Sequence, residues 1–348
     1  MKIVHMADTH LGRFYKGRLS PEVSSKRREE IWQTMEKNIN YVKDNKIDVL
    51  LLCGDIYERD YFTASDMDRL AELLNSVKET EIFIISGNHD YLDSDSPIYT
   101  VEFNKNIHFF EKEEYFEIEN LKLRVYGFSW NKKYDFKADF NFNLDKNFSN
   151  ILMLHGSTIN EEHFALNKEE IEGLGFDYVA LGHIHIRQKI SNRIYYSGSP
   201  EPVSFKDTGS HGFIEIDLDE KTKDLKIDYK GESLRNYYKH DLEINKTMSI
   251  YTIKDKIEDM LEGLEKDFNK ITLIGSYGDS DYLIEYLNYS LNYFYLEIED
   301  DLKPDYDLDD LYEKNKDNLL GKFIEKARGN EKVIDYGLRA LMEAKNED

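Results

Sequence analysis

Five short apolar runs in this chain each end in side chains that can bind a metal ion. The runs are rich in Val, Ile and Leu and are bounded by Gly, the pattern of buried strands. The residues at their ends are Asp8 and His10; Asp55; Asn88, His89 and Asp90; His155; and His183 and His185. In a layered α/β fold, strand ends present reactive groups to solvent from a rigid sheet. The five ends together predict one polynuclear metal site.

Length and composition bound the class of protein. A chain of 348 residues fits one large domain or two ordinary ones, and 40% hydrophobic with 33% charged residues allows a packed core under a solvated surface. No apolar stretch approaches the roughly 20 residues that span a bilayer. Asp8 and His10 interrupt any apolar leader, so we expect no signal peptide, no membrane association and a cytoplasmic location. Cys53, the lone cysteine, is expected to be an inert core thiol.

Strand and helix patterns alternate through about residue 190, which predicts a mixed α/β architecture with two sheets. Helices are expected over 26–44, from Ser65, and from the N-cap Asn167 to Gly173 or Gly175. Ser65-x-x-Asp68 fits a capping box at the start of the second helix. After His185 the pattern changes to strands.

A second unit is expected from about residue 235. Three strand-like segments (237–244, 271–277 and 293–300) alternate with two helix-like segments (252–268 and 282–291), the pattern of a small α+β domain. Two amphipathic helices are then expected over 310–326 and 331–345. The expected domains are therefore 1–234, 235–309 and a C-terminal helical segment, 310–348.

The net charge of −23 argues against simple electrostatic binding of nucleic acid. Residues 1–234 carry 30 basic and 42 acidic side chains, and residues 235–348 carry 16 and 27. A nucleic-acid substrate would therefore need bound cations, local basic clusters or a partner subunit. The densest basic cluster near the candidate ligands is expected either to contact a phosphate backbone or to be ordinary solvated charge; it comprises Arg13, Lys16, Arg18, Lys26, Arg27 and Arg28.

The types and spacing of the candidate ligands favour a dinuclear centre. Asp8 with His10, and His183 with His185, stand two residues apart, which places both side chains on one side of an extended chain. A carboxylate such as Asp55 can bridge two cations. Mixed nitrogen and oxygen ligation without thiolate suits Mn²⁺, Fe²⁺ or Zn²⁺. Seven ligands suit two ions that share a bridge: Asp8, His10, Asp55, Asn88, His155, His183 and His185.

Two neighbouring cations bind phosphoryl oxygens and activate water, which points to phosphoryl transfer to water. His89, beside Asn88, could assist the leaving oxygen as a cation or general acid. Asp90 could orient His89 or Asn88. The other histidines are expected to be ordinary polar residues: His5, His108, His163, His211 and His240.

In this order, the segments MADTHLG, LLCGDIY, SGNHD, LHG and GHIH resemble the calcineurin-like metallophosphoesterases. The DTHLG opening and the long helical insert before GD resemble the SbcD-type double-strand-break repair nucleases, and within them the Bacillus-type YhaO subgroup. YYSGSPEPVSF (195–205), HGFIEIDL (211–218) and LLGKFI (319–324) are also similar to that branch. The resemblance implies a two-sheet β-sandwich flanked by helices, followed by a capping domain.

The resemblance also implies a role for each residue. Asp8, His10, Asp55 and His185 would hold one Mn²⁺, and Asp55, Asn88, His155 and His183 the other. His89 would stabilise the transition state. Many relatives have a histidine three residues after the GD aspartate, thought to orient DNA for exonucleolytic cutting. Glu58 stands there in this chain, a departure that bears on the efficiency or polarity of exonuclease action.

These observations predict a Mn²⁺-dependent DNA nuclease, exonuclease and/or endonuclease, in double-strand-break repair. The resemblance implies a homodimer that works with an SbcC-like coiled-coil SMC-type ATPase. Two alternatives remain. One is another dinuclear-metal phosphoesterase, such as a nucleotidase or cyclic-nucleotide phosphodiesterase, which the acidic charge favours and the cap disfavours. The other is a non-catalytic scaffold, against which the complete ligand set argues. Two apolar stripes on the C-terminal helices would either dock on the ATPase or pack on the cap. The first comprises Leu319, Leu320, Phe323 and Ile324, and the second Val333, Ile334, Leu338, Leu341 and Met342.

Overall fold

The computed structural model describes residues 1–15, 19–111, 114–131, 142–158, 165–278, 280–303, 308–330, 333–334, 336–338 and 340–341. Within them the chain divides into two compact units, Met1–Tyr237 and Tyr238–Asp348. All seven candidate ligands belong to the first unit. Lys16, Arg18 and His163, which the sequence analysis singled out, lie outside the described residues.

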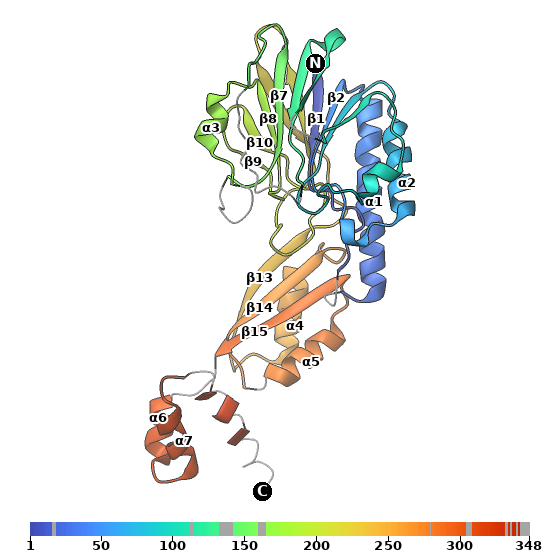
Figure 1. The fold of residues 1–348 in the computed structure, drawn as a ribbon. Coiled ribbons are helices and arrows are strands. Elements are labelled where there is room, and N and C mark those ends of the chain that lie inside the picture. Colours follow the sequence, from blue (N-terminus) through green and yellow to red (C-terminus); the bar gives the residue numbers. More distant parts are fainter. Residues whose placement is uncertain are drawn as a thin grey trace. The chain divides into compact units, whose positions relative to one another are not determined.

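The first unit contains two six-stranded sheets, as the sequence predicts (Figure 1). One has the order β12-β11-β1-β2-β3-β4, formed by Leu225–Lys230, Phe213–Leu218, Lys2–Met6, Val49–Cys53, Glu81–Ile85 and Ile107–Phe109. The other has the order β5-β6-β7-β8-β10-β9, formed by Glu114–Ile118, Leu123–Gly127, Ser149–His155, Tyr178–Gly182, Ile194–Tyr196 and Gln188–Lys189. Within each sheet, the strands that precede the candidate ligands are parallel to one another, so their carboxyl ends lie at a common edge of that sheet.

Successive side chains of each strand point to opposite faces of the sheet, which explains how the helices and the second sheet pack on the two faces of the first sheet. In β2, Leu50 and Leu52 pack towards the helices, while Val49 and Leu51 pack into the apolar cluster shared by both sheets. Both faces of the central strands are therefore covered, which is why these strands read as continuous apolar runs. The shared cluster also includes Ile151, so it extends from the first sheet to the second.

Helices α1 (Pro21–Asp44) and α2 (Ala64–Asn75) cover the outer face of the first sheet, and α3 (Lys168–Gly173) accompanies the second (Figure 1). The predicted N-cap Asn167 does cap α3, since its side chain accepts from the N–H of Glu170. The predicted start of α2 at Ser65 is wrong. Thr63 caps it, because Thr63 and Asp66 form the same capping box two residues earlier.

A buried ion network ties α1 to the segment that follows β10. Arg27 in α1 is 0% exposed and donates to the carboxylate of Glu201 at 2.6 Å. The same carboxylate accepts from the hydroxyl of Thr34 and from the backbone N–H of Leu234, both at 2.5 Å. Glu30, one turn along α1, pairs with Arg235 at 2.6 Å. This network fixes the end of the first unit against α1.

The second unit has a three-stranded sheet in the order β13-β14-β15, formed by Tyr237–Ile244, Phe268–Ser276 and Tyr295–Lys303. Helices α4 (Ile250–Met260) and α5 (Ser280–Ser290) bury Ile253, Ile257, Leu283 and Leu287 in one cluster with that sheet. The single helix predicted over 310–326 is two helices, α6 (Leu308–Asn315) and α7 (Leu319–Ala327), because Asn318 caps a new helix.

The C-terminal apolar stripes face one another. Ile324 and Ala327 of α7 are buried in one cluster with Ile334 and Leu338 from the helical residues that follow. Leu341 of the second predicted stripe is described, and Met342 lies outside the described residues. Parts of both stripes therefore share one small helical cluster, on which Leu311 and Tyr312 of α6 also pack, and this cluster is distinct from that of the three-stranded sheet.

Candidate metal centre

Four of the seven candidate ligands sit in sharp turns just after strands, while His155 is the last residue of β7. Asp8, His10, Asp55 and His183 all have positive φ angles, of 56°, 47°, 50° and 100°. L-residues adopt this conformation rarely, and Asp, Asn and His are the types that tolerate it best. Such turns bend the backbone immediately after each strand, so that the side chains converge instead of continuing along it. Local strain of this kind is typical of functional sites.

Glycines allow the turns to approach one another. A Cβ on Gly54 would lie 2.5 Å from Nδ1 of His155, and one on Gly87 would lie 2.3 Å from a carboxylate oxygen of Asp55. Any side chain at these two positions would therefore push His155 and Asp55 out of place. The glycines that bound the apolar runs in the sequence are needed for close packing of the site.

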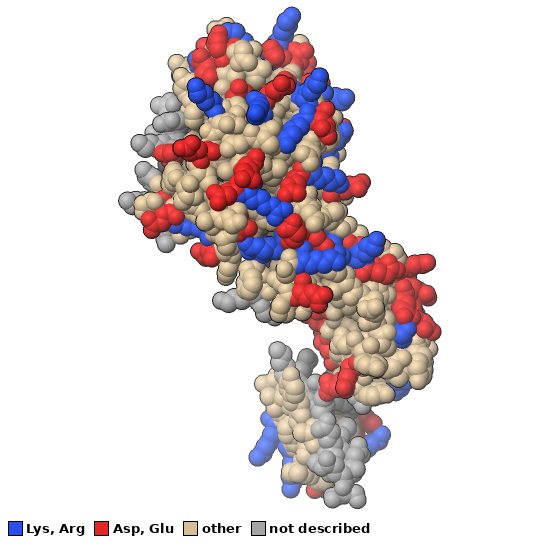
Figure 2. Space-filling view, turned by 90° about the vertical axis from the view of Figure 1, so that its right-hand side faces the viewer, with Lys and Arg blue, Asp and Glu red and all other residues tan. Residues whose placement is uncertain are grey.

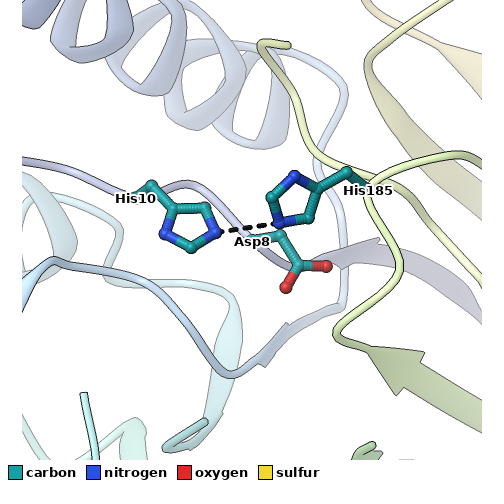
Figure 3. A group of neighbouring side chains, drawn as sticks. All are labelled: Asp8, His10 and His185. Atoms are coloured by element: carbon teal, nitrogen blue, oxygen red, sulfur yellow. Dashed lines mark hydrogen bonds between the residues drawn. The ribbon is translucent and has the colours of Figure 1, made fainter. Parts of the chain in front are cut away.

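The first ligand cluster joins Asp8, His10 and His185, whose ligand atoms lie within 4.8 Å of one another (Figure 3). Nε2 of His10 faces Nε2 of His185 at 3.0 Å. The other ring nitrogens are held by carboxylates: Nδ1 of His10 by Glu58 at 3.0 Å, and Nδ1 of His185 by Asp207 at 3.3 Å. A nitrogen that donates to a carboxylate carries the proton, so the two facing nitrogens of neutral imidazoles present lone pairs.

The second cluster joins Asp55, His155 and His183, with Asn88 beside them. Nδ1 of His155 donates to the carbonyl oxygen of Cys53 at 2.9 Å, which directs Nε2 inward. That nitrogen lies 3.1 Å from the amide oxygen of Asn88 and 3.3 Å from a carboxylate oxygen of Asp55. Nδ1 of His183 is also 3.1 Å from the Asn88 oxygen. The imidazole nitrogens of His155 and His183 and the oxygens of Asn88 and Asp55 thus converge on one position, where a cation could bind.

Asp55 is the residue that connects the clusters. Its Oδ2 lies 3.3 Å from Nε2 of His155 in the second cluster and 4.0 Å from Nε2 of His10 in the first. Its carboxylate also accepts from the backbone N–H of His89 at 2.7 Å, which fixes its rotamer. A side chain that reaches ligands of both clusters is suited to bridge two cations.

This donor set fits divalent cations. The carboxylates of Asp8 and Asp55 are buried, and around them lie imidazole nitrogens that carry lone pairs as well as N–H groups that donate hydrogen bonds. Burial of carboxylates and of facing lone pairs without a compensating positive charge is unfavourable. Either protons or cations between these atoms make the arrangement favourable, and imidazole, carboxylate and amide oxygen suit Mn²⁺, Fe²⁺ or Zn²⁺.

We expect Mn²⁺ binding to the metal-free protein to release protons and to strengthen as the pH rises. Burial opposes a charge on His155, but Asp55 and Asp8 beside it outweigh this and raise the pKa of the imidazole to about 9. Below that pH a cation must displace the proton, so affinity should improve by up to about tenfold per pH unit between pH 6 and 8.

Calorimetry in two buffers of different ionisation enthalpy measures the protons released. His108→Ala is the control, because His108 pairs with Glu81 outside both clusters, and it should release as many protons as the unaltered protein. A binding heat that is identical in both buffers would contradict the expectation.

His89 lies at the rim of the site and is held by Glu58. The side chain of His89 is 41% exposed, and its Nδ1 is 2.8 Å from the Glu58 carboxylate. This hydrogen bond raises the pKa of His89, which favours the imidazolium form. The other oxygen of Glu58 bonds to His10 and, at 2.6 Å, to Arg13. Glu58 therefore links a candidate metal ligand to the group that could stabilise charge on a substrate.

A third group of possible ligands consists of His10, Glu58 and His89. Arg13 occupies one oxygen of Glu58 in this group, and its positive charge opposes a cation there. We therefore assign the group no ion of its own. Glu58 is instead a hydrogen-bond partner of both histidines, His10 and His89.

Two acidic residues behave differently from the sequence-based expectation. Asp90 does not orient Asn88 or His89; its carboxylate accepts from the backbone N–H groups of Gly87, Asp55 and Ile56, at 2.5, 3.1 and 2.8 Å. It thereby shapes the turn that carries Asp55. Asp207 was missed altogether. Although burial opposes its ionisation, the hydrogen bond from His185 lowers the pKa of Asp207 to about 2. No apolar run precedes it, so no pattern could have marked it.

The histidines predicted to be ordinary have ordinary partners. His5 bonds to the hydroxyl of Tyr178, and His211 to backbone oxygens of Asp207 and Ser199. Within the described part of the chain, none of His5, His108, His211 and His240 belongs to a group that could hold a metal ion.

Of the predicted basic cluster, the three described arginines Arg13, Arg27 and Arg28 are each engaged by an acidic side chain. Arg27 is buried on Glu201, which rules out a role in phosphate contact. Arg13 pairs with Glu58, and Arg28 bonds to Asp66 and to backbone oxygens. On the face that carries α1 and α2, basic and acidic side chains are interspersed (Figure 2).

The fold has two sheets, and its strand ends bring together imidazole, carboxylate and amide ligands. This combination defines the class of the protein as a metal-dependent hydrolase of phosphate esters. Residues 1–187 match the family described as "Calcineurin-like phosphoesterase", and this chain belongs to that family.

Curated relatives point in the same direction. The protein named "Uncharacterized metallophosphoesterase YhaO" of Bacillus subtilis is 24% identical over 76% of this chain and 69% of its own length. The "DNA double-strand break repair protein Mre11" of Methanopyrus kandleri is 24% identical over 63% of this chain. A protein of Staphylococcus epidermidis that is named as one subunit of the nuclease SbcCD is 27% identical over 63%. The chain spans 54% and 66% of these last two proteins.

In the part of the chain that the structure describes, every helix is too short or too polar to cross a membrane.

Proposed function

We propose that this chain is a Mn²⁺-dependent DNA nuclease, with Fe²⁺ or Zn²⁺ as other metals that its ligands suit. The observation that carries the proposal is the pair of ligand clusters connected by Asp55, with His89 at their rim. Two of the similar proteins are named as a double-strand-break repair protein and as part of a nuclease, which supports DNA as the substrate.

Each side chain then has a role. Asp8, His10, Asp55 and His185 hold one ion, and Asp55, Asn88, His155 and His183 hold the other. Bound cations would neutralise charge on the phosphate and activate water near neutral pH. Glu58 raises the pKa of His89 and so favours its imidazolium form, and His89 stabilises negative charge on the phosphoryl oxygens or donates a proton to the leaving oxygen.

The domain organisation belongs to the same proposal: a nuclease domain over 1–234, a capping domain over 235–309 and a C-terminal helical segment over 310–348. We further propose a homodimer with an SbcC-like coiled-coil ATPase as partner. Because Ile334 and Leu338 are buried against α7, they cannot be the docking residues; Leu319, Val333 and Tyr336 are exposed and are available for that role.

The proposal is tested with an end-labelled hairpin DNA and Mn²⁺. We expect cleavage of the hairpin, with kcat/KM above that for a mononucleotide or a cyclic nucleotide. The matched control is His108→Ala, which should cleave as the unaltered protein does. Faster hydrolysis of the mononucleotide or the cyclic nucleotide than of DNA would favour a nucleotidase or cyclic-nucleotide phosphodiesterase and overturn the assignment to DNA.

A further inference from the structure

Two exposed aromatic rings lie in contact beside the metal centre. Phe14 is 51% exposed and Tyr61 is 41% exposed, and their ring centroids are 5.3 Å apart at an interplanar angle of 33°. Aromatic side chains are usually buried because they carry a large apolar surface. A pair that packs together yet remains exposed on its outer faces is suited to receive a third flat group.

The pair stands at the outer end of two loops whose inner ends carry the candidate ligands. Leu11 donates its N–H to the carbonyl of Ile56 at 2.8 Å and accepts from the N–H of Glu58 at 2.9 Å, so the two loops run side by side. His10 and Asp55 begin these loops. Four residues of chain reach at most about 14 Å, which bounds the separation of Phe14 from His10.

Arg28 holds the two loops together. Its guanidinium donates to the carbonyl of Gly12 in the first loop at 2.5 Å and to the carbonyl of Tyr61 in the second at 3.1 Å. Asp66 pairs with the same guanidinium at 2.7 Å. These bonds fix the two loops relative to each other, so the backbone that carries the rings needs no ordering when a ligand binds, which lowers the entropy cost of binding.

The charges nearby explain why a ring platform would be useful here. Arg13, Arg27 and Arg28 are engaged by Glu58, Glu201 and Asp66, and the chain has a net charge of −23. A substrate phosphate thus gains little from these cations. Stacking of a base on an aromatic face does not depend on net charge and accepts any of the four bases.

Resting on the proposed nuclease function, we propose that Phe14 and Tyr61 form a stacking platform for a nucleobase of an unpaired strand, next to the phosphate that is cleaved. A base inside a duplex is already stacked on its neighbours, so only an unpaired end, loop or flap can offer its face to the platform. The platform therefore gives the enzyme a preference for single-stranded segments.

Two single-stranded oligonucleotides of equal length test the platform, one of thymidines and one with abasic sites throughout. Both carry the same phosphates, so only the bases differ. With Mn²⁺, the unaltered protein should cleave the thymidine strand with a kcat/KM higher by roughly 5- to 150-fold, the range that stacking contributes per base. The double variant Phe14→Ala/Tyr61→Ala should cleave both strands equally, at the rate of the abasic strand.

The matched control is Tyr115→Ala. Tyr115 on the edge strand β5 is 49% exposed, and its ring centroid lies 5.2 Å from that of the buried Tyr126 on β6, so Tyr115 is an exposed ring in contact with another ring, as Phe14 and Tyr61 are. This variant should keep the preference for bases. All three proteins should melt at similar temperatures, because the replaced rings are exposed.

A second measurement separates the platform from the nuclease function. A strand that contains 2-aminopurine is mixed with the protein in Ca²⁺, and its fluorescence should be quenched by the unaltered protein but not by Phe14→Ala/Tyr61→Ala. Equal cleavage of both strands, or quenching that survives in the double variant, overturns the platform while the nuclease function stands. Quenching without any cleavage supports the platform and overturns the nuclease function. Neither quenching nor cleavage overturns both.

Discussion

Asp55→Ala should lose both metal ions and all hydrolysis of phosphodiesters. Asp55 is buried between the clusters, 3.3 Å from Nε2 of His155 and 4.0 Å from Nε2 of His10, so its removal takes a ligand from each ion at once. The remaining histidines would then face one another without the carboxylate that balances a cation. Metal content per chain, measured by elemental analysis after gel filtration, should fall from two ions to less than one.

His89→Ala is the matched comparison, because His89 follows Asn88 but points to Glu58 at the rim. It should retain both ions while kcat falls by about 10²- to 10⁴-fold, the contribution of a positioned acid or charge-stabilising group. If His89→Ala lost metal as fully as Asp55→Ala does, the roles assigned to these two residues would be wrong.

Arg27→Met should lower the free energy of unfolding of the first unit by about 3–5 kcal/mol. The guanidinium is fully buried on Glu201, and its removal leaves a buried carboxylate with only the Thr34 hydroxyl and the Leu234 N–H as donors. Both tryptophans, Trp32 and Trp130, belong to the first unit, so their fluorescence during urea unfolding reports on this unit alone.

Arg69→Met provides the control for the loss of an arginine. Arg69 on α2 also bridges to two glutamates of α1, Glu29 and Glu36, but its side chain is 36% exposed. Exposed pairs contribute about 0–1 kcal/mol and the stacking of the Arg69 guanidinium on the Trp32 ring about 0.5–1 kcal/mol, so this variant should be destabilised less than Arg27→Met. If both substitutions lowered the free energy of unfolding equally, burial of the Arg27 network would not contribute to stability.

The strands and the candidate ligands could be predicted because both are local signals. A short run such as DVLLLCG, bounded by Gly, is typical of a strand buried on both faces, and the polar residue after it is then expected at the sheet edge. The seven predicted ligands come together in the structure, although the prediction used nothing about the loops between them.

Partners that are distant in the sequence could not be predicted in this way. Asp207 meets His185 through a loop, and Arg27 meets Glu201 across 174 residues of chain. The sequence shows Arg27 as one more cation in a basic cluster, and only packing shows that it is buried. The start of α2 was misplaced for a smaller reason: Thr63 and Ser65 both begin a capping pattern, and local sequence does not choose between them.

The segment that connects β10 to β11 contributes to both the buried ion network and the metal centre. It carries Glu201, which closes the ion network under α1, and Asp207, which orients His185. The thermal stability of the first unit and its affinity for metal therefore depend on the same segment. Random substitution in this segment would change both properties together. Directed evolution for heat resistance would be better aimed at the exposed faces of α1 and α2, where changes leave the histidine and its carboxylate in register.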